Sequence, residues 1–323
     1  MARTRARLAA VVALFATVAL VPGGAAATGN DRVLVVLATT GPAPYSVTDF
    51  RQVAATAGAF FSTASFGQMR LSFDVTPWLP ASSLAATCGG FNERSMDGVV
   101  APAREAAQRA GYKPELYDQV LYALADVRCG FYGYTWGQQV VLTRPPSLEL
   151  LVHELGHTLG LGHALASTCA VRCGTLDPGD PYTPMGIGLM DFSAYEKTLL
   201  GWIGAQPRAT TSRTYTLVPP TRQTKLAQAL VVDTPVGQWW LEYRTRPFRG
   251  VLVRYIDVTQ SVGPFAPSTT LILRPTGMKR DWVVAGETFR AAGLFTTRVE
   301  RAGANAATLR FKWTGARHYA SVR

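Results

Sequence analysis

Apolar and polar positions in the first part of the chain follow two different periods. Residues 32–39 are continuously apolar, which predicts a buried strand, and residues 69–75 alternate, which predicts a half-buried strand. Between them, residues 47–66 place apolar side chains at helical spacing. The same reasoning predicts helices over 95–110 and 191–200, strands over 118–126 and 138–143, and loops over 76–92 and 164–188. Helices interspersed with strands indicate a mixed α/β domain built on a twisted sheet.

Helical periodicity ends near residue 206, where a series of short β-rich runs separated by Pro and Gly begins. These runs cover residues 214–218, 229–233, 239–243, 251–256, 270–273, 282–284, 295–299 and 307–313. Many short strands with turn signals indicate an antiparallel sandwich or jelly roll. We therefore expect an α/β (α+β) domain over residues 28–205 and an all-β accessory domain over residues 206–323.

Residues 1–27 have the features of an export signal. Three arginines within residues 3–7 precede an apolar run over residues 8–21, which is short for a membrane span. The alanines at 25–27 then offer a cleavage site. We expect cleavage after Ala27 and secretion, with an uncleaved N-terminal anchor as the alternative. No transmembrane segment is predicted after the signal.

The four cysteines are Cys88, Cys129, Cys169 and Cys173. Two disulfides suit an exported protein, and three pairings are open. We favour Cys88–Cys129 and Cys169–Cys173, because the second pair shares one loop just after the histidine-rich segment described below.

Charge is divided unevenly along the chain. Residues 28–205 hold 11 Lys and Arg against 15 Asp and Glu, a net of −4, whereas residues 206–323 hold 18 against 6, a net of +12. A basic C-terminal part suggests an anionic wall polymer or polysaccharide as partner, and no nucleic acid is expected. A solvated basic surface is the slightly favoured alternative, because the arginines are scattered and form no basic run.

Residues 153–163 read H-E-x-x-H-x-x-G-x-x-H and hold three of the four histidines. Residues four apart on a helix lie one turn apart on the same face, so His153 and His157 can point at one ion. Gly160 lets the chain leave the helix, which can bring His163 back as a third ligand. Three protein ligands and one open position describe a catalytic zinc site.

Glu154 follows the first of these ligands and is the candidate general base. Zinc would lower the pKa of its bound water, and Glu154 would accept that proton and deliver it to a leaving amine. The sequence therefore predicts metal-assisted amide hydrolysis. A buried helix that happens to carry three histidines is the alternative, which the additional Gly160 and His163 disfavour.

The chain resembles the metzincin zinc metallopeptidases, and among them the gametolysin-like secreted peptidases. The resemblance covers most of the mature chain and rests on residues 153–163 and, more weakly, on residues 179–186, 200–203 and 239–244. It implies a metzincin-type catalytic domain and a secreted zinc endopeptidase that acts on extracellular or cell-wall proteins.

The resemblance also assigns residues after the histidine motif. Metzincins place a methionine turn below the zinc, and Met185, 22 residues after His163, fits that role. Some metzincins carry a tyrosine two residues further on, where this chain has Ile187. Tyr182 is the nearest candidate stabiliser of the transition state, with a packing role as the alternative.

Two further segments have open interpretations. Asp177 and Asp180 are candidate calcium ligands, but two carboxylates are few for a complete site and a turn explains them better. The aromatic and glycine residues over 130–137 predict either a rim strand on which an extended peptide docks or a plain turn.

Two other functions remain as alternatives to the peptidase. One is a secreted surface-binding or adhesion protein on a metzincin scaffold, and the other is a peptidoglycan-directed amidase. An intact Glu154 favours an enzyme, because a binding protein needs no proton acceptor at that position.

Overall fold

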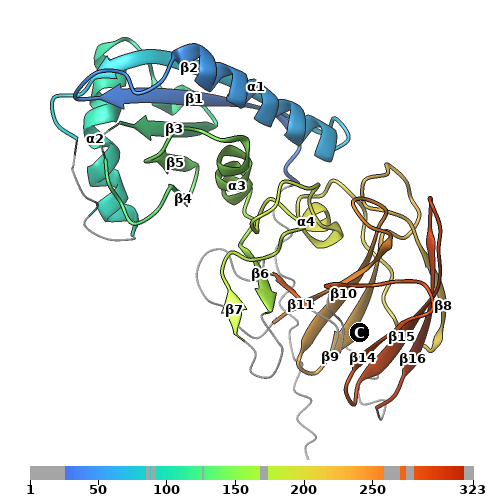
Figure 1. The fold of residues 1–323 in the computed structure, drawn as a ribbon. Coiled ribbons are helices and arrows are strands. Elements are labelled where there is room, and N and C mark those ends of the chain that lie inside the picture. Colours follow the sequence, from blue (N-terminus) through green and yellow to red (C-terminus); the bar gives the residue numbers. More distant parts are fainter. Residues whose placement is uncertain are drawn as a thin grey trace, which may run out of the picture.

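The computed structural model describes residues 26–84, 88, 92–125, 127–167, 174–257, 270–273 and 280–315. It shows a mixed α/β protein with few helices, several sheets and a β-rich C-terminal part (Figure 1). The α+β class expected from the sequence is confirmed at this level. Among the described residues, no helix has both the length and the apolar character needed to cross a bilayer.

The N-terminal part is built on a five-stranded sheet with the order β2-β1-β3-β5-β4. Its strands are β1 (Gly29–Thr39), β2 (Met69–Pro80), β3 (Gln119–Leu124), β4 (Gly133–Trp136) and β5 (Gln139–Leu142). All neighbouring pairs are parallel except β4, which is antiparallel to β5. Strand β4 is therefore an edge strand, as one of the two interpretations of residues 130–137 predicted.

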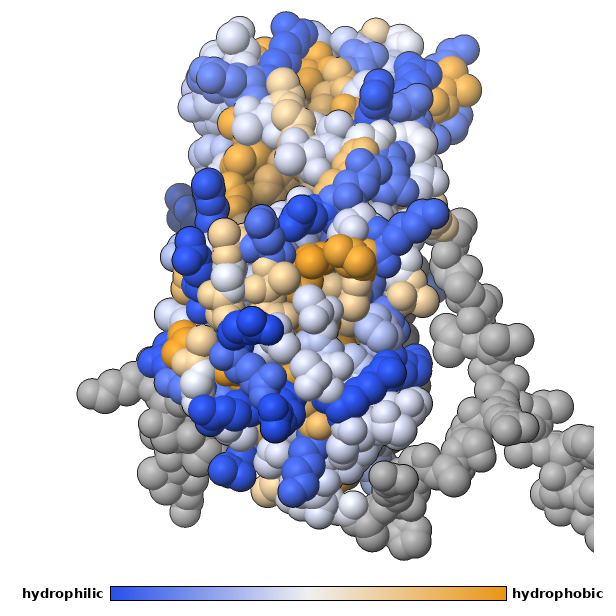
Figure 2. Space-filling model, turned by 90° about the vertical axis from the view of Figure 1, so that its right-hand side faces the viewer, coloured by the Kyte–Doolittle hydropathy of each residue, from blue (hydrophilic) through white to orange (hydrophobic). Residues whose placement is uncertain are grey.

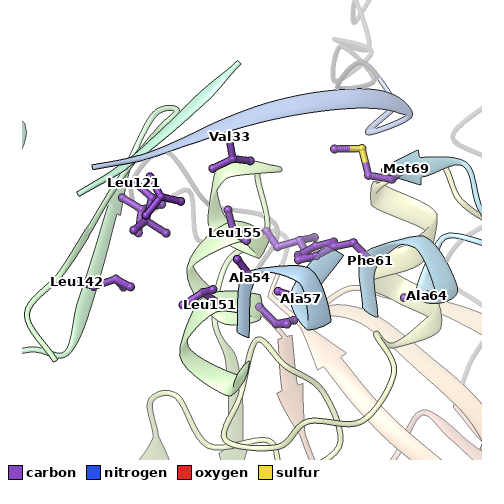
Figure 3. Packing of buried hydrophobic residues seen from close by; sticks show 14 of the residues in the cluster. Val33, Ala54, Ala57, Phe61, Ala64, Met69, Leu121, Leu142, Leu151 and Leu155 are labelled. Carbon is purple, nitrogen blue, oxygen red and sulfur yellow. The ribbon is translucent and has the colours of Figure 1, made fainter. Parts of the chain in front are cut away.

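Helices cover both faces of this sheet. On one face lie α1 (Val47–Ala64) and α3 (Leu148–Thr158), and on the other lies α2 (Glu93–Arg109), followed by the short 3-10 helix η1 (Pro114–Leu116). Residues 33–38 of strand β1 are continuously apolar because their alternate side chains fill both cores, Val33 and Val35 on one side and Leu34 and Val36 on the other. Figure 3 shows α3 packed through Leu155 in the first of these cores.

Strand β2 runs further than the sequence predicted. The expected loop over residues 76–92 is wrong at its start, because β2 continues to Pro80 and pairs with β1 on both sides of an irregularity at residues 76–77. The prolines at 77 and 80 are tolerated because β2 is an edge strand, which can leave backbone positions without a ladder hydrogen bond.

The β-rich part consists of two sheets packed face to face. The larger has the order β7-β6-β12-β11-β10-β9 with β13 paired to β11, and the smaller has the order β14-β15-β16-β8. Their strands are β6 (Ala164–Ser167), β7 (Thr175–Leu176), β8 (Arg213–Leu217), β9 (Ala229–Thr234), β10 (Gly237–Arg244), β11 (Gly250–Ile256), β12 (Thr270–Ile272), β13 (Trp282–Val283), β14 (Thr288–Ala291), β15 (Phe295–Ala302) and β16 (Ala307–Trp313). One core, which includes Leu241 from the larger sheet and Phe295 and Phe311 from the smaller, fills the space between them.

The two parts of the chain share the larger sheet. The expected loop over residues 164–188 instead contains β6 and β7, and β6 pairs in parallel with β12 from the C-terminal part. Sequence pattern could not show this pairing, since β6 is only four residues long and its partner lies about a hundred residues later. Strand β14 was also not predicted. Hydrogen bonds thus cross the expected boundary at residues 205 and 206.

A second link is a group of four buried charged residues, Asp180, Glu242, Arg244 and Arg254, which we call the buried ion cluster. Arg254 Nε lies 2.8 Å from Asp180 Oδ2, and its Nη1 lies 3.2 Å from Glu242 Oε2. Arg244 forms an ion pair with the other oxygen of Glu242. Burial opposes ionisation of Glu242, but the two arginines outweigh it and lower the pKa of this carboxyl.

Helix α4 (Ala194–Leu199) is tied to this cluster. Ser193 and Glu196 form a capping box at its start, and the backbone N–H of Ala194 donates to Glu242 Oε2 at 2.6 Å. Glu196 also accepts a hydrogen bond of 2.6 Å from Thr183, which lies in the segment that carries Met185. The β-rich part therefore holds both α4 and the segment before Met185.

The predicted Cys88–Cys129 disulfide is confirmed, with its Cα atoms 5.1 Å apart. Cys169 and Cys173 lie outside the described residues, as does most of the predicted export signal. Ala27, the residue before the expected cleavage point, donates its N–H to Leu200 O at 3.0 Å and accepts a hydrogen bond from the indole of Trp202 at 2.6 Å.

Candidate metal centre

The three motif histidines lie together, as their spacing predicted. His153 and His157 are one turn apart on α3, which ends at Thr158. Gly160 has φ +87°, a conformation that suits glycine, and the backbone N–H of Leu161 bonds back to Gly156 O. This turn returns the chain so that one potential ligand atom from each of His153, His157 and His163 lies within 4.8 Å of the others. The cluster could hold a metal ion.

Each histidine is oriented by a bond to its Nδ1 atom. His153 Nδ1 lies 2.8 Å from Pro184 O, and His157 Nδ1 lies 2.7 Å from Leu161 O. A carbonyl oxygen only accepts, so Nδ1 of both rings must carry the hydrogen. His163 Nδ1 lies 2.5 Å from Asp177 Oδ1. Partners of this kind orient metal-binding histidines and fix which nitrogen faces the ion.

The donor set fits a divalent cation. With hydrogen on both Nδ1 atoms, the Nε2 atoms of His153 and His157 present lone pairs to each other across 3.1 Å. Two lone pairs at this distance repel each other. A cation bound by both nitrogen atoms would remove this repulsion, because both lone pairs would then coordinate the same ion. Burial lowers the pKa of His153 to about 4 and that of His157 to about 3, so both rings are neutral at pH 7 and do not need to lose a proton to bind a metal.

Met185 lies directly against the helix that carries two of these histidines. It is fully buried, and a Cβ atom added at Gly156 of α3 would lie 2.3 Å from its sulfur. The turn around it is closed by a hydrogen bond of 3.1 Å from the N–H of Gly186 to Thr183 O. Pro184 of the same turn accepts the Nδ1–H of His153. The turn thus packs under α3 and orients one of the three rings.

Glu154 points away from solvent towards strand β4. Thr135 of β4 donates a hydrogen bond of 2.6 Å to Glu154 Oε2, and a Cβ atom at Gly133 would lie 2.4 Å from Oε1. Only glycine at position 133 leaves room for this carboxyl. Burial raises the pKa of Glu154 to about 7, against a smaller lowering by the Thr135 hydrogen bond. The candidate base is therefore fixed between α3 and the edge strand β4.

Tyr182 contacts residues of the β-rich part. Its ring packs edge-on against Phe248 and Trp282 of the β-rich part, and its hydroxyl donates to Asp281 Oδ2 at 3.0 Å. These are the contacts of a packing tyrosine, and the role of transition-state stabiliser stays a prediction. Ile187, which stands where some metzincins have a tyrosine, is exposed.

The two candidate calcium ligands are used separately. Asp177 pairs with His163, and Asp180 is fully buried beside Arg254 and caps the N–H of Tyr182 at 2.8 Å. Their contacts favour the interpretation of this segment as a structured turn. Among the described residues, the three histidines form the one group that satisfies the geometry of a metal site.

Sequence reasoning missed the partners of the site residues. Thr135, Asp177 and Pro184 each bond to one of them, from segments that lie 19, 14 and 31 residues away. One signal in the sequence could have indicated that Thr135 contacts a site residue. Its strand is rich in glycine, and glycine leaves room for a closely packed neighbour. Nothing in the local pattern marks Asp177 as a partner of His163.

The fold and the site define a mixed α/β protein with a three-histidine candidate metal centre beside a buried glutamate. No family model matches the sequence. No curated protein matches it either. Solved structures do match, with 37 chains found. One of them, from a structure of a chaperone–substrate complex, has a TM-score of 0.33 and 16% identity over 53% of this chain. The match spans 33% of that other chain, and at this TM-score it carries no argument about fold or function.

Proposed function

We propose that this protein is a secreted zinc-dependent endopeptidase that hydrolyses peptide bonds of extracellular or cell-wall proteins. One observation carries the proposal. Three oriented histidines come together, and the buried glutamate that follows the first of them does not belong to the group of potential metal ligands. A structural zinc site would use a fourth protein ligand, whereas three ligands and a neighbouring acid suit catalysis.

His153, His157 and His163 would hold the ion. When bound, zinc supplies Lewis acidity, which polarises a carbonyl group and makes water more acidic. The chain's own contribution is orientation, because each ring is fixed through Nδ1 by Pro184, Leu161 or Asp177.

Glu154 would move the proton. Its carboxyl follows the first ligand in the chain and has one oxygen fixed by Thr135. Held there, it would take a proton from the attacking water and pass it to the leaving amine, which is the work of a general base that later acts as an acid.

Strand β4 supports a peptide as the substrate. It is the edge of the five-stranded sheet, so it can pair with an extended peptide through its backbone. Thr135 and Gly133 of this strand contact Glu154, so a peptide paired with β4 would lie close to the proposed base. The edge strand thus offers a way to place a peptide bond beside the metal centre.

Incubation of the zinc-loaded protein with a peptide library, with and without a chelator, tests the proposal. We expect internal cleavage that stops when the metal is removed and returns when zinc is restored. Glu154→Gln should bind zinc with unchanged affinity and lose nearly all cleavage. The matched control is Glu149→Gln, which changes an exposed acid in the first turn of the same helix and should keep full activity.

Two outcomes would refute the peptidase. Cleavage of cross-linked peptidoglycan fragments, with no cleavage of any library peptide, would assign an amidase. Zinc binding without hydrolysis of either substrate, in the native protein as in Glu154→Gln, would assign a binding protein.

A further inference from the structure

The smaller sheet of the β-rich part has an outer face made of polar residues. Along β15 and β16, buried residues such as Phe295, Leu309 and Phe311 alternate with exposed or half-buried polar ones. Successive side chains of a strand point to opposite faces, so the polar set shares the outer face. Four cations belong to this set, Arg290 of β14, Arg298 of β15, and Arg310 and Lys312 of β16. We call them the cationic face.

Strand register brings these cations together. Arg298 pairs directly with Arg310, Lys312 pairs with Thr296, and Thr296 pairs with Arg290 on its other side. Directly opposed residues of neighbouring strands have Cβ atoms about 5 Å apart. Cations that the sequence spreads over more than twenty positions therefore occupy adjoining places on one face of the sheet.

The arrangement is unfavourable for the isolated protein. Like charges directly opposite each other on a sheet destabilise it. Glu300 forms an ion pair with Arg310, but among the described residues Arg290, Arg298 and Lys312 have no ion pair of their own. Arg310 remains 69% exposed despite its partner. Figure 2, which faces this side of the molecule, shows hydrophilic residues gathered over the lower part.

The other residues of the face narrow the choice of partner. Between the cations lie threonines such as Thr214, Thr288 and Thr296, whose hydroxyls can bond to sugar hydroxyl and ring oxygens. The aromatic side chains of these strands, including Tyr215 and Phe311, are directed into the core, so they are not placed to stack on bases. The face also lacks the apolar side chains with which a peripheral protein enters a bilayer.

We propose that the cationic face binds an anionic polysaccharide, with the arginines and Lys312 contacting its acidic groups and the threonines its sugar hydroxyls. The inference rests on strand register and charge, and it stands independently of the peptidase proposal. Its consequence is that the β-rich part would hold the protein on a polymer surface.

Binding to polygalacturonate, measured over a range of salt concentrations, tests the proposal, with neutral dextran and a short DNA duplex as comparison ligands. The face variant combines R290Q, R298Q, R310Q and K312Q. The matched variant removes the same charge from the loops before β9 and β11, and combines R222Q, K225Q, R246Q and R249Q. The melting temperature of each variant shows that it is folded.

We expect the native protein to bind polygalacturonate, to ignore dextran and to bind DNA more weakly. The face variant should lose roughly tenfold or more in affinity at low salt and show a shallower salt dependence, while the matched variant changes little. Equal losses in the two variants would mean that net charge alone acts, which overturns the proposal. Tighter binding of DNA than of polygalacturonate, or no binding of either, would overturn it as well. If the face variant does not fold, the single substitution Arg298→Gln replaces it in the same binding measurements.

Discussion

The three histidines and the buried ion cluster are both groups of polar side chains brought close together by the fold, but their charges and lone pairs are arranged in opposite ways. In the ion cluster, Arg254 contacts both Asp180 and Glu242, so opposite charges cancel inside the protein. In the histidine cluster, three like rings meet, and the Nε2 atoms of two of them face each other with lone pairs. The charges of the ion cluster balance within the protein, whereas the histidine cluster could be completed by a metal ion.

This difference between the two clusters shows how a polar cluster that stabilises the fold can be distinguished from one that binds a ligand. Buried ions need paired geometry, because an unpaired buried charge costs several kcal/mol. A cluster that neutralises itself joins segments, as Arg254 of β11 does with the segment before Met185. In the histidine cluster the three rings have fixed orientations, and burial lowers the pKa of His153 and His157, which suits the binding of a cationic ligand.

The largest expected effect comes from removing a histidine. His157→Ala should weaken zinc binding by more than about a hundredfold, since even the loss of an outer partner of a ligand costs about 10–100-fold. Competition with a chromophoric chelator measures this affinity. His318→Ala, which changes the histidine outside the motif, is the control and should leave the affinity unchanged. If the two variants bind zinc equally well, the three histidines do not form the site.

Removing the central arginine of the ion cluster should destabilise the fold. Arg254→Met leaves Asp180 and Glu242 buried without their shared partner, which costs about 3–5 kcal/mol. Urea unfolding measures the loss. The matched control is Arg208→Met, which breaks an exposed ion pair with Asp233 and should cost about 1 kcal/mol or less. Similar losses in the two variants would contradict the view that the cluster joins the two parts.

Removing the hydroxyl that fixes Glu154 should affect turnover more than binding. Thr135→Val keeps the shape of the side chain but loses a hydrogen bond to a carboxylate, worth about 1.5–3 kcal/mol, so kcat should fall roughly 10–100-fold. KM and zinc affinity should stay close to native values, and Thr135→Ser should restore most of kcat.

Thr143→Val is the control for Thr135. It removes a hydrogen bond of 2.6 Å to Phe131 O in the same region without touching Glu154. An equal fall in kcat for both valine variants would assign Thr135 a purely structural role.

The smallest expected effect concerns a surface pair of the β-rich part. Hydrogen bonds from Arg280 and from the N–H of Val284 lower the pKa of Glu287 below its usual 4.5. A lowered carboxyl pKa contributes stability at pH values above 4.5, and this contribution is lost as pH falls through the folded-state pKa. Glu287→Gln should therefore cost about 1 kcal/mol or less at pH 7, and the difference from the native protein should shrink as the pH is lowered below 4.5. Urea unfolding over a series of pH values checks this, and a difference that grows towards acid would contradict it.

Local patterns predicted the main helices and the grouping of the three histidines. His153 and His157 could be placed from the helical repeat alone, and His163 from the glycine that ends the helix. Ser46 and Ser147 accept hydrogen bonds from the N–H groups of Asp49 and Leu150, and so cap the starts of α1 and α3.

Contacts between distant segments could not be predicted in this way. The ion pair between Asp180 and Arg254 spans 74 positions, and β6 finds its partner in β12 only in the folded chain. Asp180 occurs in a pattern typical of a turn and Arg254 in one typical of a strand, so neither pattern indicates that the side chain is buried. The cationic face was missed for the same reason, because strand register, not spacing in the chain, brings Arg298 to Arg310.

The parallel pairing of β6 with β12 has a consequence for the order of folding. His163 immediately precedes β6, and its carbonyl accepts a hydrogen bond of 3.2 Å from the N–H of Thr270 at the start of β12. During synthesis, His163 is therefore added to the chain long before β12, the strand that donates this hydrogen bond. The contact is of high sequence separation and forms late, since closing so long a loop is entropically costly. We therefore expect the backbone around His163 to reach its final position only after Thr270 has been synthesised.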